Sequence, residues 1–278
     1  MIDSIRSQFR VVIEKRWAVG VILLMFTLVL INFFSNVFKY QGTDVQAMIN
    51  PMRLLFLSSE SMDPGTLSFY FLQLFPLLVI LPVGFSYADD KNSREEIYLV
   101  SRVGKKKYFW GKTIAVFIVN FWVFALPLML EIILNCLAFP LDANGNFANS
   151  ATYDLSYIMS TENYMFFDFF KISPILYAFI SCIMFGIVAG ILGIFTLAVS
   201  MFFFRFKIGL LFPVYILLYG IGMVDSLFPQ IEVKTSHFAY LSAFDISYKS
   251  ESSYICLFGT IAIISILLIY VKQRRDVL

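Results

Sequence analysis

Charged residues are scarce in this chain of 278 residues, of which only 14% are Asp, Glu, Lys or Arg. Ordinary globular proteins contain about 25% charged residues, so this composition is not that of a soluble domain. Histidine occurs once, at His237, which excludes any site that needs two histidines, such as an H-E-x-x-H zinc site. A Ser-His-Asp site would have to recruit His237 from a loop that has no nucleophile motif nearby.

Cysteine is also rare. Cys136, Cys182 and Cys256 lie in or beside apolar runs, and their spacing fits neither a metal site nor a disulfide framework. We therefore predict no catalytic residue, no metal and no cofactor in this chain, and no nucleic-acid partner.

Long apolar runs are abundant: hydrophobic residues make up 59% of the chain, and its mean hydropathy is +0.80. A membrane-spanning helix needs roughly 20 mainly apolar residues. We therefore predict an all-α, polytopic protein that crosses the lipid bilayer six times and forms one transmembrane domain, residues 1–278. The six predicted spans are Ala18–Phe38, Leu67–Ser86, Thr113–Ala138, Pro174–Met201, Ile208–Phe228 and Tyr254–Val271.

The distribution of Lys and Arg predicts the orientation, because cytoplasmic loops carry the excess of basic residues. With six spans, the two termini and the loops after spans two and four share one side. Those segments hold 16 of the 21 basic residues. We expect both termini to be cytoplasmic, in a plasma membrane of bacterial type.

Residues 1–16 have the pattern of an amphipathic helix. Ile2, Ile5, Phe9, Val12 and Ile13 recur at helical spacing. We predict a helix that lies on the inner leaflet of the membrane. The alternative is a plain basic flank that only orients the first span.

The tripeptide Gly111-Lys112-Thr113 resembles the end of a phosphate-binding loop. The full motif needs a second glycine five residues before Gly111, and that position is Lys106. A run long enough to cross a membrane follows it, rather than a soluble helix. We therefore predict that this chain does not bind nucleotide.

Residues 93–104 predict a short cytoplasmic helix, about Arg94–Val103. Ser93 and Glu96 have the spacing of a capping box, in which each side chain satisfies an N–H group at the helix start. Arg102 suits the negative end of the helix dipole. Gly104 falls where a left-handed stop is expected.

This short helix also carries apolar side chains. We expect Ile97, Tyr98 and Val100 to be exposed, with Leu99 and Val103 on the adjoining side. A basic collar of Lys105, Lys106, Lys107 and Lys112 follows. Two interpretations remain open: a docking surface for a partner, or a solvated loop whose charges only set the topology.

The stretch "YADDKNSREEIYLVSRVGKKKYFWGK" resembles the loop after the second span of type-2 ABC exporter permeases. The matching residues are Asp89, Asp90, Ser101, Arg102, Gly104, Lys105, Tyr108 and Lys112. Many relatives have Ser-Gly where this chain has Ser93-Arg94. The resemblance implies a coupling helix that sits in a cleft of a separate ATPase. The coupling residues would then be Ser93, Glu96, Ile97, Tyr98, Leu99, Val100, Arg102, Gly104 and Lys105.

The resemblance also implies an assembly. A second permease subunit, identical or related, would join two ATPase subunits that hold ATP and magnesium, and an amphipathic substrate would move outward by alternating access. Two other classes stay open. One is an ATP-independent carrier or channel, and the other is an immunity or sensor protein that binds a peptide without transporting it.

Three polar side chains in the predicted spans are candidates for a substrate pathway. Glu131 is the one acid well inside a span, and such acids often line a cavity. The alternative is that Glu131 reaches the lipid headgroups from the outer end of its span. Asp225 is a weaker candidate, and Asn120 is weighed against a helix–helix hydrogen bond.

Gly186, Gly190 and Gly193 follow small-x-x-x-small spacing, which lets helix backbones approach closely. Packing within one subunit is the favoured interpretation, and a dimer seam is the alternative.

Overall fold

The structure is a computed structural model. It describes residues 8–9, 13, 16–45, 48–58, 65–141, 164–202, 208–228, 235–244 and 250–275, and these are helical with no strand among them. The predicted helix over residues 1–16 lies mostly outside the described residues.

Among the described residues, five helices are long and apolar enough to cross a membrane. They are α2 (Arg16–Tyr40), α6 (Lys105–Ala138), α9 (Pro174–Phe202), the segment η5–α10 (Ile208–Leu211 and Phe212–Leu227) and α12 (Glu251–Arg275). Each covers one of the predicted windows. The all-α class expected from the sequence is therefore confirmed, and these five candidate spans are compatible with a multi-pass membrane protein.

The remaining window, Leu67–Ser86, is not one continuous helix. Helix α3 (Leu67–Leu78) ends after 12 residues, turns occupy residues 79–85, and α4 (Ser86–Asn92) follows. Pro82 lies in the break, where it lacks the N–H group that a continuous helix needs and its ring would clash with the preceding turn. The α4 helix then leads to α5 (Glu95–Val103).

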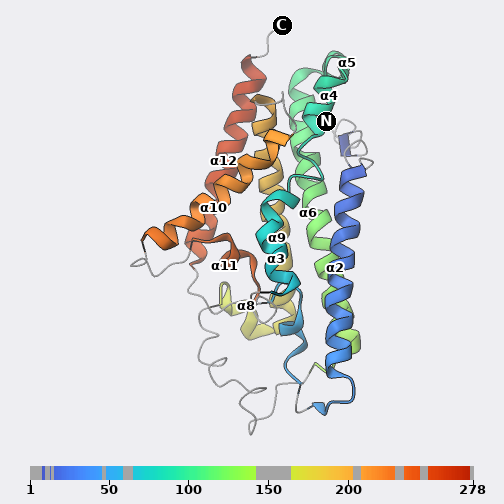
Figure 1. The fold of residues 1–278 in the computed structure, drawn as a ribbon. Coiled ribbons are helices and arrows are strands. Elements are labelled where there is room, and N and C mark those ends of the chain that lie inside the picture. The colour runs from blue at the N-terminus through green and yellow to red at the C-terminus, as the bar shows by residue number, and fades with distance from the viewer. Residues whose placement is uncertain are drawn as a thin grey trace.

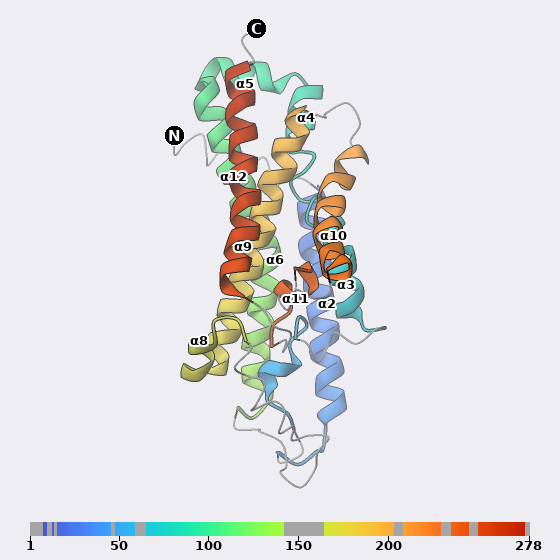
Figure 2. The same cartoon turned by 90° about the vertical axis from the view of Figure 1, so that its left-hand side faces the viewer.

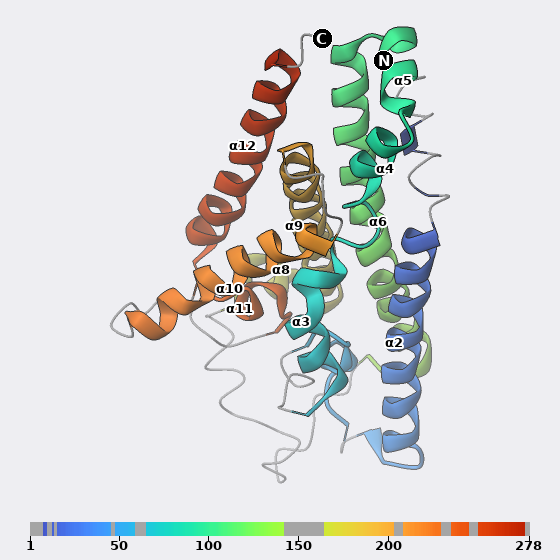
Figure 3. The same cartoon turned by 45° about the horizontal axis from the view of Figure 1, so that its top comes forward.

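The elements form an elongated bundle (Figure 1). Helices α2, α6, α9 and α12 run along its length, as Figure 2 also shows, while α10 is inclined to them in Figure 1 and Figure 3. The start of α2, helix α5 and the end of α12 lie at one end, which we call the α5 end. The short helices η2 (Pro51–Leu54) and α8 (Phe167–Ile172) lie toward the other, which we call the loop end.

Helices α6 and α9 pack closely through the glycines of α9. A Cβ atom on Gly190 would lie 2.5 Å from the Phe117 ring, and one on Gly193 would lie 2.5 Å from Asn120 Nδ2. Gly186 of α9 faces Phe121 and Ala125 of α6. The three glycines thus pack within one subunit, which was the interpretation favoured over a dimer seam.

Candidate functional site

Helix α5 ends as expected but begins differently. The predicted capping box does not form: Arg94 occupies the N-cap in a left-handed conformation, with φ of 60° and no side-chain cap. The Ser93 hydroxyl instead donates to the carbonyl oxygens of Asp89 and Asp90, at 2.9 and 3.3 Å. The reason is that α4 ends directly before Ser93, so the carbonyl groups of its last turn lie within reach of the hydroxyl.

Glu96 braces the helix and Gly104 ends it. Glu96 reaches out of α5 to accept a hydrogen bond of 3.1 Å from the Tyr87 hydroxyl. At the far end, the N–H of Gly104 donates to the Val100 carbonyl at 2.9 Å. Gly104 has φ of 87° and ψ of 142°, so it ends α5 with a positive φ but outside the left-handed helical region. This conformation suits a residue without a Cβ atom.

No residue of α5 is buried. Ile97 and Tyr98 are the most exposed of its apolar side chains, at 67% and 75%. The prediction that Val100 is exposed is wrong, because Val100 is half-buried and packs with Leu99 against the hydrophobic core. The exposed apolar face of α5 is therefore Ile97 and Tyr98, which lie beside exposed Ser101 and Arg102. We call it the α5 face.

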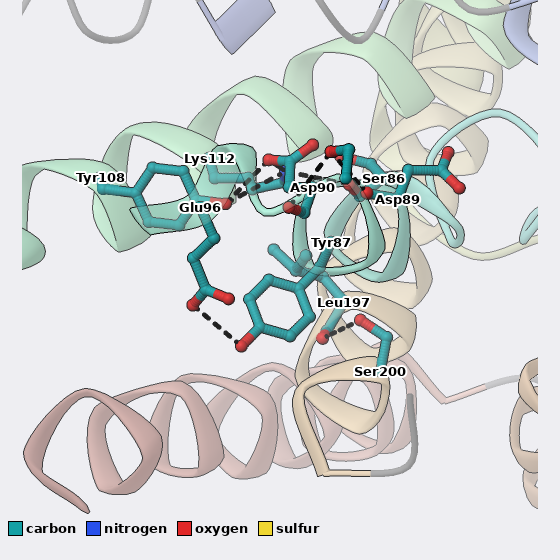
Figure 4. A network of polar contacts seen from close by, with 10 residues as sticks. Ser86, Tyr87, Asp89, Asp90, Glu96, Tyr108, Lys112, Leu197 and Ser200 are labelled. Carbon is teal, nitrogen blue, oxygen red and sulfur yellow. Dashed lines mark hydrogen bonds and ion pairs between the residues drawn. The ribbon is translucent and has the colours of Figure 1, made fainter. Parts of the chain in front are cut away.

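A buried ion pair connects α4 to α6 behind the α5 face (Figure 4). Lys112 and Asp90 pair directly, with exposed fractions of 0% and 2%. Lys112 also donates to the Ser86 carbonyl at 3.1 Å, and the Tyr108 hydroxyl donates to Asp90 at 2.8 Å. We call Asp90, Tyr108 and Lys112 the α5-end cluster.

The α5-end cluster changes the predicted basic collar. Lys106 and Lys107 are exposed, but Lys112 belongs to the interior. The sequence carries a signal for this: Tyr108 and Lys112 are four residues apart and therefore share a face of α6. That face turns inward, and the prediction had assigned Lys112 to solvent from its charge alone.

Glu131 lies near the C-terminal end of α6 and is only 1% exposed. Its carboxylate accepts the Phe56 N–H at 2.9 and 3.0 Å and the Asn32 amide at 2.7 Å. The alternative in which Glu131 reaches the lipid headgroups is therefore wrong. The carboxylate points inward and holds the backbone of the 51–58 segment.

Side-chain amides hold the same segment. Asn32 and Asn36 of α2 both donate to the Leu54 carbonyl at 2.9 Å. Asn135 of α6 donates to the Pro51 carbonyl at 3.1 Å. Residues 51–58 are thus mostly buried, and several of their backbone groups are bonded to side chains of α2 and α6. Together with Glu131, these three asparagines form the loop-end cluster.

A small cavity lies beside Glu131. Its wall combines α6, α9, the loop-end segment and residues 240–243, where the Ala243 N–H donates to the Leu57 carbonyl at 2.7 Å. The wall is mainly apolar, and it contains Leu128, Tyr177, Ser181 and Ser242 in addition to Glu131. The arrangement can enclose an apolar group next to a carboxylate.

The other two pathway candidates do not line this cavity. Asn120 is fully buried and donates to the Val79 carbonyl at 2.9 Å and the Ala189 carbonyl at 3.1 Å, which ties the break after α3 to α9. Asp225 accepts hydrogen bonds from Thr235 and from the Ser236 N–H. Both residues hold the backbone of other segments, which is the alternative weighed for Asn120.

Within the part of the chain that the structure describes, no group of three His, Cys, Asp or Glu side chains could hold a metal ion. Comparison with protein-family models, curated proteins and solved structures gave no match. The fold and composition define an all-helical protein whose five long apolar helices are compatible with a multi-pass membrane protein.

Proposed function

We propose that this protein is the membrane-spanning permease subunit of an ATP-driven ABC exporter. It works with a separate ATPase subunit that holds ATP and magnesium, and with a second permease subunit. Six crossings make up the domain, the second of them formed by α3 and α4. The α5 end, with both chain termini, faces the cytoplasm of a bacterial plasma membrane.

The observation that carries the proposal is the α5 face. Ile97 and Tyr98 are largely exposed on a short helix of which no residue is buried. A loop that only sets topology has no use for two adjacent large apolar side chains. Their position at the end of the molecule, beyond the apolar part of the bundle, favours a protein partner over lipid.

The α5-end cluster supports the mechanical part of the proposal. A coupling helix transmits force only if it is fixed to the spans that move. Glu96 joins α5 to Tyr87 near the start of α4, and the Asp90–Lys112 pair joins α4 to α6. A displacement of α5 by a partner therefore reaches α6 directly.

Helix α6 extends this connection along the molecule. It has 34 residues and is thus about 50 Å long at 1.5 Å per residue. Lys112 lies in its second turn, and Glu131 lies beside the cavity. In the proposed cycle, closure of the ATPase dimer moves α5 and α6, and the cavity region opens outward.

A pull-down tests the proposal. Burial of one large apolar side chain is worth about 1.5–3 kcal/mol, so Ile97→Asp with Tyr98→Asp should weaken ATPase binding by about a hundredfold or more. The measurement is co-purification, from detergent-solubilised native membranes, of a protein that binds and hydrolyses ATP. Lys106→Gln is the control, because it removes an exposed charge from the neighbouring turn and keeps the α5 face.

The outcomes separate the function classes. Loss of the ATPase in the double variant, with normal amounts of the variant in the membrane, supports the exporter. Loss with Lys106→Gln alone means that the contact is electrostatic and that the α5 face is not the docking surface. If no ATPase co-purifies with the unmodified protein, the carrier, channel or immunity class replaces the exporter.

A further inference from the structure

The cavity beside Glu131 carries a further inference about the ligand. Side chains from several segments form its wall, among them Leu57, Leu128 and Met184. This lining favours an occupant with a compact apolar body.

Glu131 is the one acidic or basic side chain in the described wall of the cavity. Its hydrogen-bond donors, the Phe56 N–H and the Asn32 amide, are neutral groups. No lysine, arginine or histidine of the described residues forms an ion pair with it. A carboxylate removed from water without a counter-charge costs several kcal/mol. A positively charged group bound in the cavity would therefore stabilise the Glu131 carboxylate.

The carboxylate also has room for a further donor. A carboxylate accepts about four hydrogen bonds. Among the described residues, Oε1 accepts from Asn32 and Phe56, whereas Oε2 accepts only the Phe56 N–H, which it shares with Oε1.

We propose that this cavity binds a cationic amphiphile, whose apolar body fills the cavity and whose ammonium group donates to Glu131. The three asparagines keep the 51–58 segment and the carboxylate in place for that contact. Binding itself stands on the cavity and the carboxylate alone. That the bound amphiphile is the exported substrate rests on the function proposed above.

Two matched probes test the ligand class. The ion 4-phenylbutylammonium and the alcohol 4-phenylbutanol share one apolar body and differ only in the head group. Their affinities are measured on the purified full-length protein in nanodiscs of zwitterionic lipid, without an ATPase. The ammonium should bind roughly thirtyfold more tightly or better, as expected for a close buried charge pair.

Two variants sharpen the measurement. Glu131→Gln should lower the affinity for the ammonium to that for the alcohol, and should leave the alcohol unchanged. Ser181→Leu narrows the cavity without touching the carboxylate and should weaken both probes alike. Lys106→Gln, an exposed position near the α5 end, should change neither affinity.

Equal affinities of the two probes for the unmodified protein overturn the proposal, and so does binding of neither probe. A preference for the ammonium that survives in Glu131→Gln also overturns it. The comparison on the unmodified protein needs no variant, so it decides the matter even if Glu131→Gln does not fold. Because no ATPase is present, failure here is distinguishable from failure of the pull-down.

Discussion

The α5-end cluster and the loop-end cluster each bury a carboxylate, but they hold it with different partners. Asp90 is paired with the Lys112 ammonium and the Tyr108 hydroxyl, whereas Glu131 accepts only from an amide and a backbone N–H. A buried charge pair fixes two helices to each other. Loss of one of the two charges strongly destabilises the fold, because the other charge is then left unpaired. A set of amide hydrogen bonds holds a segment and is less sensitive to neutralisation of the carboxylate. The difference suits a connection at one end and a ligand site at the other.

The largest effect should follow from breaking the charge pair on one side. Lys112→Met leaves Asp90 buried without its counter-charge, and we expect a loss of about 3–5 kcal/mol in the free energy of unfolding. Asp90→Asn combined with Lys112→Met should recover most of that loss, since no lone charge remains. Thermal unfolding of the purified protein in detergent measures both, and a double variant no better than Lys112→Met would contradict the pairing.

A smaller effect is expected at the loop end. Glu131→Leu removes the acceptor of two buried donors, each worth about 1–3 kcal/mol when left unsatisfied. Glu131→Gln keeps an acceptor for the Phe56 N–H and should cost about 1 kcal/mol. The same unfolding assay compares them. Equal losses for the two variants would mean that the charge of Glu131, and not its hydrogen bonds, holds the 51–58 segment.

Between the two clusters, Asn120 joins the break after α3 to α9 and depends on Gly193. In Gly193→Ala the added Cβ would meet Asn120 Nδ2 at 2.5 Å, and overpacking of this kind costs about 1–3 kcal/mol. Gly20→Ala is the control, because nothing lies within 4 Å of its added Cβ. If both alanine variants unfold at the same temperature, Asn120 is not tightly held.

The smallest effect is a pH dependence that neither cluster causes. Burial lowers the pKa of His237, in the short helix α11 (His237–Leu241) after α10, from its ordinary 6.5 to about 4. Because the unfolded chain takes up the proton first, stability is fully present above pH 6.5 and falls as the pH drops toward 4. The loss at about pH 5.5 should be on the order of 1 kcal/mol. His237→Phe should flatten this part of the stability profile, and an unchanged slope would assign it to other groups.

The sequence predicted the features that composition and periodicity determine. Apolar runs located the five long helices, and the charge pattern with Gly104 located α5 to within a residue. The sequence did not predict the break after α3, because Pro82 lies within a run that is apolar enough to cross a membrane.

The candidate sites were only partly predictable, because they depend on pairs far apart in the chain. Asp90 and Lys112 are 22 residues apart, and Glu131 binds a backbone N–H 75 residues away. Glu131 could be selected as a lone acid in an apolar run, but its partners could not. Ser93 has the spacing of a capping residue for α5, but its hydroxyl donates to carbonyl groups of α4 instead.

The most direct test of the central claim is a photo-crosslinking amino acid placed at position 98 of the α5 face. In native membranes we expect it to crosslink to an ATP-binding subunit, with a yield that changes when ATP is added. The same group at position 169 in α8, at the loop end, should give no such product. Crosslinks from position 98 to lipid alone, or to proteins that do not bind ATP, would contradict the account of α5 as the helix that couples this protein to an ATPase.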